Sequence, residues 1–92
     1  MKLIVGKYPL CQEAFFQNIT MPVGAKPLCV KNIGKTEEPV LYAEIDAEST
    51  HMADKTFAIV ATGEGLPVGH RKYIGTFTTR HGQFVWHVFE IA

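Results

Sequence analysis

YIGTFTTRHGQFVWHVFEI, residues 73–91, holds two runs of apolar, aromatic and β-branched residues around a short polar segment. Runs of this kind are typical of β-strands, so we expect strands over residues 73–79 and 84–91. The segment between them, Thr79-Arg80-His81-Gly82-Gln83, places a glycine where a short hairpin loop needs a left-handed backbone. The stretch therefore predicts an antiparallel hairpin at the C-terminal end.

Similar runs recur along the rest of the chain, separated by clusters of Gly, Pro, Asn and Asp, and no long helical period occurs. In residues 40–46 apolar and polar side chains alternate, which predicts one buried face and one partly acidic exposed face. The pattern predicts an all-β fold, a compact small β-sandwich or barrel of six to seven short antiparallel strands. The expected strands are Lys2–Tyr8, Phe15–Met21, Pro27–Ile33, Val40–Asp46, Lys55–Thr62, Tyr73–Thr79 and Phe84–Ile91.

The connections carry turn residues. MPVGAK at 21–26 predicts a turn, and residues 31–35 predict the end of a strand that continues as a hairpin. Pro39 has no N–H to donate to a central ladder. Residues 46–54 are too few for a stable helix, so any helix should be short and confined to residues 11–17 or 46–54.

Length and charge indicate one domain over residues 1–92 without a broad basic surface. Nine Lys and Arg balance nine Asp and Glu, which argues against binding to duplex nucleic acid or to an anionic membrane. The charges are unevenly placed, however. Residues 1–35 hold five Lys and one Glu, whereas residues 36–70 hold one Lys and seven acids. These blocks either neutralise one another across neighbouring strands or give a dipolar surface that steers a charged ligand.

The two cysteines and the N-terminal segment bear on location. Cys11 and Cys29 have no zinc-ribbon spacing and are too few for a disulfide framework. The first apolar run stops at Gly6, and no stretch approaches the ~20 apolar residues of a membrane span. We therefore expect a cytoplasmic protein with reduced thiols.

No residue pattern predicts catalysis. The four histidines show no metal-ligand spacing, so we expect no metal site and no cofactor. The only serine, Ser49, lies in an acidic segment without a nucleophile elbow, and Cys29 lies within a predicted strand. For His87, a hydrogen-bonded residue within an aromatic strand is the simplest interpretation. We expect that the protein is not an enzyme.

ATGEGLPVGHRK, residues 61–72, combines glycines with a His-Arg-Lys cluster. Glycine backbone N–H groups and cationic side chains can hold an anion, although the order matches neither a Walker A nor a dinucleotide motif. The segment is either a plain surface loop or a site for an anion or nucleotide. On the second interpretation an oligomer interface supplies aromatic rings that stack on a base. The expected ligand-binding residues are Gly63, Gly65, His70, Arg71, Lys72, Tyr73 and Trp86.

Strand 84–91 is apolar on both faces, with Phe84, Trp86 and Val88 on one face and Val85 and Phe89 on the other. Such a strand is either central in a two-layer fold or covered by a second subunit. We expect a homo-oligomer.

Three segments carry a resemblance to a known family: MPVGAK followed by PLCVKN at 21–32, ATGEGLP at 61–67, and above all KYIGTFTTRHGQFVWHVFE at 72–90. They are similar to a family of short bacteriophage and prophage proteins whose function is not known. The resemblance implies a phage-type origin and a small β-rich fold, and it brings no catalytic residue and no substrate.

The sequence and the resemblance leave three classes of function open. The first is a non-enzymatic phage-type binding protein, a counter-defence factor that sequesters an anionic or nucleotide signalling ligand or blocks a host defence protein. The second is a phage accessory or structural assembly protein. The third is a small enzyme with a site between subunits. A retained small ligand would favour the first class, and incorporation into virions the second.

Overall fold

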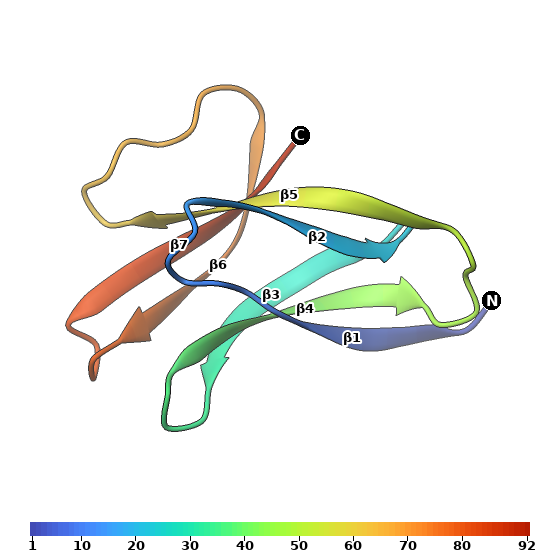
Figure 1. Cartoon of the computed structure of the whole chain (residues 1–92), viewed down its shortest axis with the longest axis horizontal. Coiled ribbons are helices and arrows are strands. Elements are labelled where there is room, and N and C mark those ends of the chain that lie inside the picture. The colour runs from blue at the N-terminus through green and yellow to red at the C-terminus, as the bar shows by residue number, and fades with distance from the viewer.

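The protein folds into seven β-strands and no helix, as described by a computed structural model that covers all residues, 1–92. The strands lie in two sheets packed face to face (Figure 1). This architecture confirms the predicted all-β sandwich. The strands are β1 (Leu3–Pro9), β2 (Phe16–Pro22), β3 (Lys26–Ile33), β4 (Glu38–Asp46), β5 (Met52–Ala61), β6 (Arg71–Thr79) and β7 (Phe84–Ile91).

The first sheet has the strand order β1-β4-β3 and the second the order β2-β5-β7-β6, and every neighbouring pair is antiparallel. Two predicted hairpins are confirmed. In the β6–β7 hairpin Thr79 lies opposite Phe84, and Gly82 has the expected positive φ of 87°. In the β3–β4 hairpin Ile33 lies opposite Glu38.

Both ends of β7 and the last residues of β3, β4 and β6 were predicted correctly, whereas the other nine strand ends were wrong by one to three residues. The largest difference is at β5, which begins at Met52 rather than Lys55, because Met52 and Asp54 pair with Pro22 and Thr20 of β2. Strand β6 likewise begins two residues early, at Arg71, opposite Ile91. These extensions depend on partner strands far away in the sequence, which a local pattern does not reveal.

The other differences are in the connections. Residues 11–15 and 47–51 form turns, with no helix in either segment. Pro39 lies in β4, the central strand of its sheet, but near its start. Its carbonyl accepts the N–H of Leu10 at 3.0 Å, so only the donor half of that pair is missing.

The core lies between the sheets. The side chains of Leu41, Phe57, Met21 and Val88 are fully buried there, and the ring of Trp86 packs against them. Along β4, Leu41 lies in the core and Ile45 packs against it, as the predicted alternation of residues 40–46 requires. The opposite face is half-buried rather than exposed at Tyr42, Glu44 and Asp46, and Val40 is buried.

One lateral edge of the sandwich is closed by the approach of β3 to β6. Asn32 Nδ2 of β3 donates to the carbonyl of Thr78 in β6 at 2.6 Å. Close by, Gly75 lies against Val30. A Cβ atom on Gly75 would lie 2.9 Å from Val30 Cγ1 and 3.1 Å from the Val30 nitrogen. The missing side chain of Gly75 therefore lets the two edge strands meet.

The segment of residues 62–70 crosses strand β7. Strands β5 and β6 flank β7 and both run antiparallel to it, so the connection between them must pass over β7. It does so on the outer face, where it arches away from the three-stranded sheet (Figure 1). Thr62 Oγ1 lies 2.8 Å from Nε2 of His87, and Pro67 is buried. The outward side chains of β7 are half-buried, so the crossing segment covers this face in part. Strand β7 is an inner strand of its sheet, between β5 and β6, which is one of the two arrangements that its sequence allowed.

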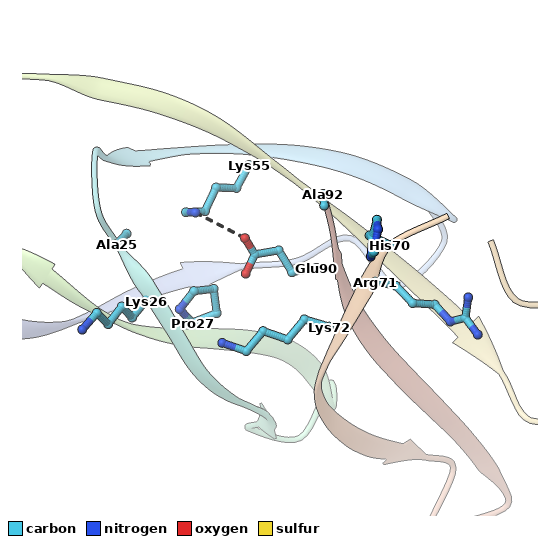
Figure 2. A pocket seen from close by; sticks show the side chains of 9 residues that line it. All are labelled: Ala25, Lys26, Pro27, Lys55, His70, Arg71, Lys72, Glu90 and Ala92. Carbon is cyan, nitrogen blue, oxygen red and sulfur yellow. Dashed lines mark hydrogen bonds and ion pairs between the residues drawn. The ribbon is translucent and has the colours of Figure 1, made fainter. Parts of the chain in front are cut away.

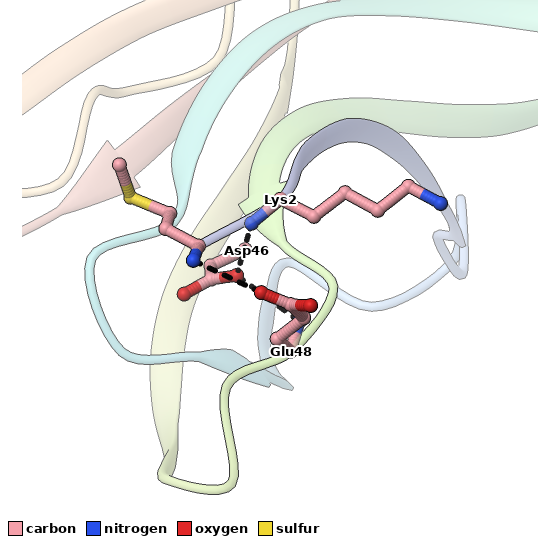
Figure 3. Close-up of polar contacts among 4 residues, drawn as sticks. Lys2, Asp46 and Glu48 are labelled. Atoms are coloured by element: carbon pink, nitrogen blue, oxygen red, sulfur yellow. Dashed lines mark hydrogen bonds and ion pairs between the residues drawn. The ribbon is translucent and has the colours of Figure 1, made fainter.

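Asp46, the last residue of β4, fixes the start of β1 (Figure 3). Its Oδ1 accepts the backbone N–H groups of Lys2 at 3.1 Å and of Glu48 at 3.0 Å. These two hydrogen bonds hold the pKa of Asp46 below its ordinary value of 3.8, and the bond from Lys2 has the larger effect. The amino group of Met1 also lies 2.9 Å from the Glu48 carboxylate.

The chain contains no helix with the length and apolarity needed to cross a membrane.

Candidate functional site

An open cleft of about 440 Å³ lies where the starts of β3 and β6 meet the end of β7 (Figure 2). Antiparallel pairing places Lys72 opposite Glu90, and the closed edge of the sandwich brings β3 alongside β6. Strand β5 adds Lys55 from the far side of β7. The residues that line the cleft are Ala25, Lys26, Pro27, Lys55, His70, Arg71, Lys72, Glu90 and Ala92.

The side chains of the cleft carry an excess of positive charge. Three lysines and one arginine face a single carboxylate side chain, that of Glu90. Glu90 Oε2 is paired with Lys55 Nζ at 3.3 Å, and both side chains are half-buried. Lys26 and Lys72 form no ion pair with any carboxylate. Two ammonium groups are therefore available to an anion that enters the cleft.

Arg71 lines the cleft but its guanidinium points away from Glu90 (Figure 2). Its Nη1 donates to the carbonyl of Pro67 at 3.1 Å and to that of Gly69 at 3.4 Å. Arg71 thus holds the crossing segment in place. The neighbouring His70 is anchored through its backbone, because its carbonyl accepts the N–H of Ala92 at 3.2 Å. The imidazole of His70 is exposed at the rim.

The structure brings together three of the seven residues expected from the sequence, His70, Arg71 and Lys72. Gly63 and Gly65 lie in the exposed crossing segment and do not line the cleft. The positive φ of Gly63, 96°, provides the turn that leaves β5.

The two aromatic residues of the expected site lie elsewhere. Tyr73 is on the outer face of β6, where its hydroxyl bonds Thr76 and its ring meets Phe89 edge to face. Trp86 lies near the other end of β7, stacked on Phe77, and its Nε1 donates to Thr79 Oγ1 at 3.0 Å. Neither ring reaches the cleft.

Lys26, Lys55 and Glu90 line the cleft but were missed from the sequence. They come from three different strands, and no local motif surrounds them. The only sequence signal was the excess of lysine in residues 1–35, which includes Lys26.

A second groove, at the opposite end of the strands, contains more carboxylates than cations. It has a volume of about 490 Å³ and lies between the β3–β4 and β6–β7 turns. It contains Glu13, Glu37 and the rings of Phe84 and Trp86, with Arg80 as its one cation. Glu37 Oε1 accepts the backbone N–H of Arg80 at 2.8 Å, which joins the two turns. The charges that are clustered along the sequence are interleaved in the fold, because Lys26 of β3 lies opposite Glu44 of β4.

His87 forms a hydrogen-bond network on the outer face of the four-stranded sheet, as its interpretation from the sequence predicted. Its Nε2 lies 2.8 Å from Thr62 Oγ1 and its Nδ1 lies 3.1 Å from Thr76 Oγ1. Both ring nitrogens are thus engaged. No three His, Cys, Asp or Glu side chains form a cluster that could hold a metal ion, and Cys11 and Cys29 are free thiols.

Comparison with known proteins gives one match. The model of a family described as a domain of unknown function, DUF7352, matches residues 1–92. No curated protein and no solved structure matches the chain.

Proposed function

The chain belongs to the DUF7352 family, and for this member we propose a binding function: the protein holds a small phosphorylated anion in the lysine-lined cleft without turning it over. The observation that carries the proposal is the convergence of Lys26, Lys55 and Lys72 from three strands on one cleft. Two of these three ammonium groups have no carboxylate partner. A lysine ammonium is a compact point charge that suits phosphate oxygens.

The size and lining of the cleft restrict the ligand. A volume of about 440 Å³ lies within the usual range for small-molecule sites. None of the nine lining residues is Phe, Tyr or Trp, so a base cannot be held by stacking on those rings inside the cleft. The cleft therefore recognises phosphate groups by charge, while the rest of the ligand lies toward the exposed imidazole of His70. The resemblance to phage proteins makes the nucleotide signals of a host the first ligands to test, with sequestration as the counter-defence role.

The local charge of the cleft supports the same proposal. Its side chains include three lysines and one arginine but a single carboxylate, that of Glu90. A local excess of positive charge attracts an anion and raises its association rate at low ionic strength. Binding should therefore weaken as salt is added.

Calorimetry with pyrophosphate, ATP and a cyclic dinucleotide tests the proposal. At least one should bind, and each of Lys26→Ala and Lys72→Ala should weaken that binding by about tenfold or more, because a charge-assisted contact is lost. The matched control is Lys35→Ala, an exposed lysine in the β3–β4 turn, which should leave the affinity unchanged. The proposal fails if none of the three binds, or if the Lys35 variant loses as much affinity as the others.

A protein partner is the second candidate, favoured by the groove that contains Glu13 and Glu37. Phe84 is 46% exposed there, beside Trp86 and two carboxylates, a combination that suits a basic segment of a protein. In this case Phe84→Ser should abolish a defined complex with a host protein, whereas Lys26→Ala and Lys72→Ala should leave it intact. The two sets of variants thus separate the two candidates.

A further inference from the structure

Strand β1 is an edge strand with unpaired backbone groups. The N–H of Ala47 donates to the carbonyl of Lys2, and the N–H of Leu10 donates to the carbonyl of Pro39. Lys2 and Leu10 flank β1 on either side, and both are even-numbered. The pairing of β1 with β4 is continuous between them, so the even-numbered residues of β1 bond to β4. In an antiparallel ladder alternate residues point their N–H and C=O groups to opposite sides. The groups of Leu3, Val5 and Lys7 therefore point away from β4, toward solvent.

The β1 edge also exposes three consecutive apolar side chains. Leu3 is 55% exposed, Ile4 40% and Val5 62%. Edge strands β3 and β6 cover each other through the contact of Gly75 with Val30. The remaining edge strand, β2, exposes one large apolar side chain, Phe16, but continues with polar Asn18 and Thr20 and ends at Pro22. A long apolar edge without a covering element is a site for pairing with another strand.

We propose that a second copy of this chain occupies this edge, its β1 pairing antiparallel with β1 about a two-fold axis at Val5. Val5 then forms a hydrogen-bonded pair with Val5 of the partner subunit, and Leu3 pairs with the partner subunit's Lys7. The outward groups of three residues in each copy make six backbone hydrogen bonds. The two three-stranded sheets become one six-stranded sheet in the order β3-β4-β1-β1-β4-β3.

Charge complementarity favours this register on the outer face. Leu3 lies opposite Asp46 within one chain, so Lys7 of the partner subunit comes two strand spacings, about 9.6 Å, from Asp46. A lysine side chain spans this distance across Leu3. Lys7 has no carboxylate partner within its own chain. The axis repeats the contact, so two such ion pairs form for each dimer.

On the inner face the register places Ile4 opposite Gly6 of the partner subunit. Gly6 has no side chain, and the side chains of Ile45 and Tyr8 lie over it instead. Their nearest atoms are 2.9 and 3.1 Å from the position that a Cβ atom would take. Ile4, which is largely exposed within its own chain, then packs against these apolar side chains. A register shifted by one residue would send Val5 to the inner face of the partner strand pair and lose both contacts.

The solution mass, measured by light scattering from about 1 µM to about 1 mM, tests the dimer over a range in which a weak one dissociates. We expect twice the chain mass of 10.2 kDa at high concentration. Val5→Pro removes an outward N–H but no bond to β4, so it should raise the dissociation constant by about ten- to hundredfold while the chain stays folded. The matched control is Asn18→Pro. Its N–H also points outward, from the β2 edge, so the dimer should persist.

Cross-linking tests the position of the axis. A hydrogen-bonded antiparallel pair has Cα atoms about 5.5 Å apart, within the reach of a disulfide, so Val5→Cys should link two chains on mild oxidation. Two Lys7→Cys positions lie more than about 13 Å apart along the strands, so this variant should link no faster than the wild type, which carries Cys11 and Cys29. A monomer at every concentration overturns the proposal. So does a dimer that Val5→Pro leaves intact, or equal linking of the two cysteine variants.

Discussion

Replacing Gly75 with alanine should lower the free energy of unfolding by about 1–3 kcal/mol, the usual cost of inserting a methyl group into a packed site. The new Cβ would lie 2.9 Å from Val30 Cγ1 and 3.1 Å from the Val30 nitrogen. A side chain can rotate away, but the backbone nitrogen moves only if strand β3 moves. That movement also strains the 2.6 Å hydrogen bond between Asn32 and Thr78.

Urea unfolding followed by tryptophan fluorescence measures this effect, because Trp86 packs against the core between the sheets. In a domain of this size 1 kcal/mol corresponds to about 4–8 °C in Tm, so thermal unfolding gives an independent value. The matched control is Gly65→Ala. A Cβ at Gly65 meets nothing within 4 Å and its φ is not positive, so the change should stay within about 0.5 kcal/mol.

A second substitution separates the two contacts of the new methyl group. Val30→Ala removes Cγ1 but keeps the backbone nitrogen, so in the Val30→Ala background Gly75→Ala should cost less, though not nothing. If Gly75→Ala is as mild as Gly65→Ala, strands β3 and β6 do not approach as described and the reasoning is refuted.

Three further outcomes are expected. Because the pKa of Asp46 is lower in the folded chain, its carboxylate stabilises the fold above the ordinary pKa of 3.8, and this contribution is lost as the pH falls through the folded value. The stability difference between wild type and Asp46→Asn, from urea unfolding, should therefore shrink below pH 3.8; a constant difference would contradict the role of the Lys2 and Glu48 hydrogen bonds. Thr62→Val removes the bond to His87 and should cost about 0.5–1.5 kcal/mol, with faster proteolysis of the crossing segment, and unchanged proteolysis would argue against that anchor. Gly82→Ala forces a side chain onto a φ of 87° and should cost about 1–2 kcal/mol in thermal unfolding, whereas a neutral result would mean that the hairpin loop has another conformation.

The strands could be predicted from the sequence because each is marked by a local run of apolar, aromatic or β-branched residues. The run at 84–91 and the glycine of its hairpin needed no knowledge of distant residues. The start of β5 could not be predicted, since Met52 is a strand residue only because Pro22 lies opposite it. Strand order is non-local in the same way.

The candidate site was predictable only in part, for a related reason. His70, Arg71 and Lys72 are consecutive and form a visible cluster. Lys26 and Lys55 join them only after three strands have been placed side by side, so no spacing in the sequence marks them. The sequence suggested that the glycines of residues 63–69 bind an anion. In the structure, Gly63 and Gly69 adopt the positive φ values with which the chain turns as it crosses β7.

That passage also determines when the four-stranded sheet can form. All three strands of the smaller sheet are present once residue 46 has been synthesised, and its central strand β4 can then pair with both neighbours. The larger sheet must wait, because β5 and β6 have no contact with each other until β7, the last strand, inserts between them. We therefore expect the smaller sheet to form first during synthesis. We also expect closure of the core to be slow, because β7 must pair with two strands that are not in contact with each other.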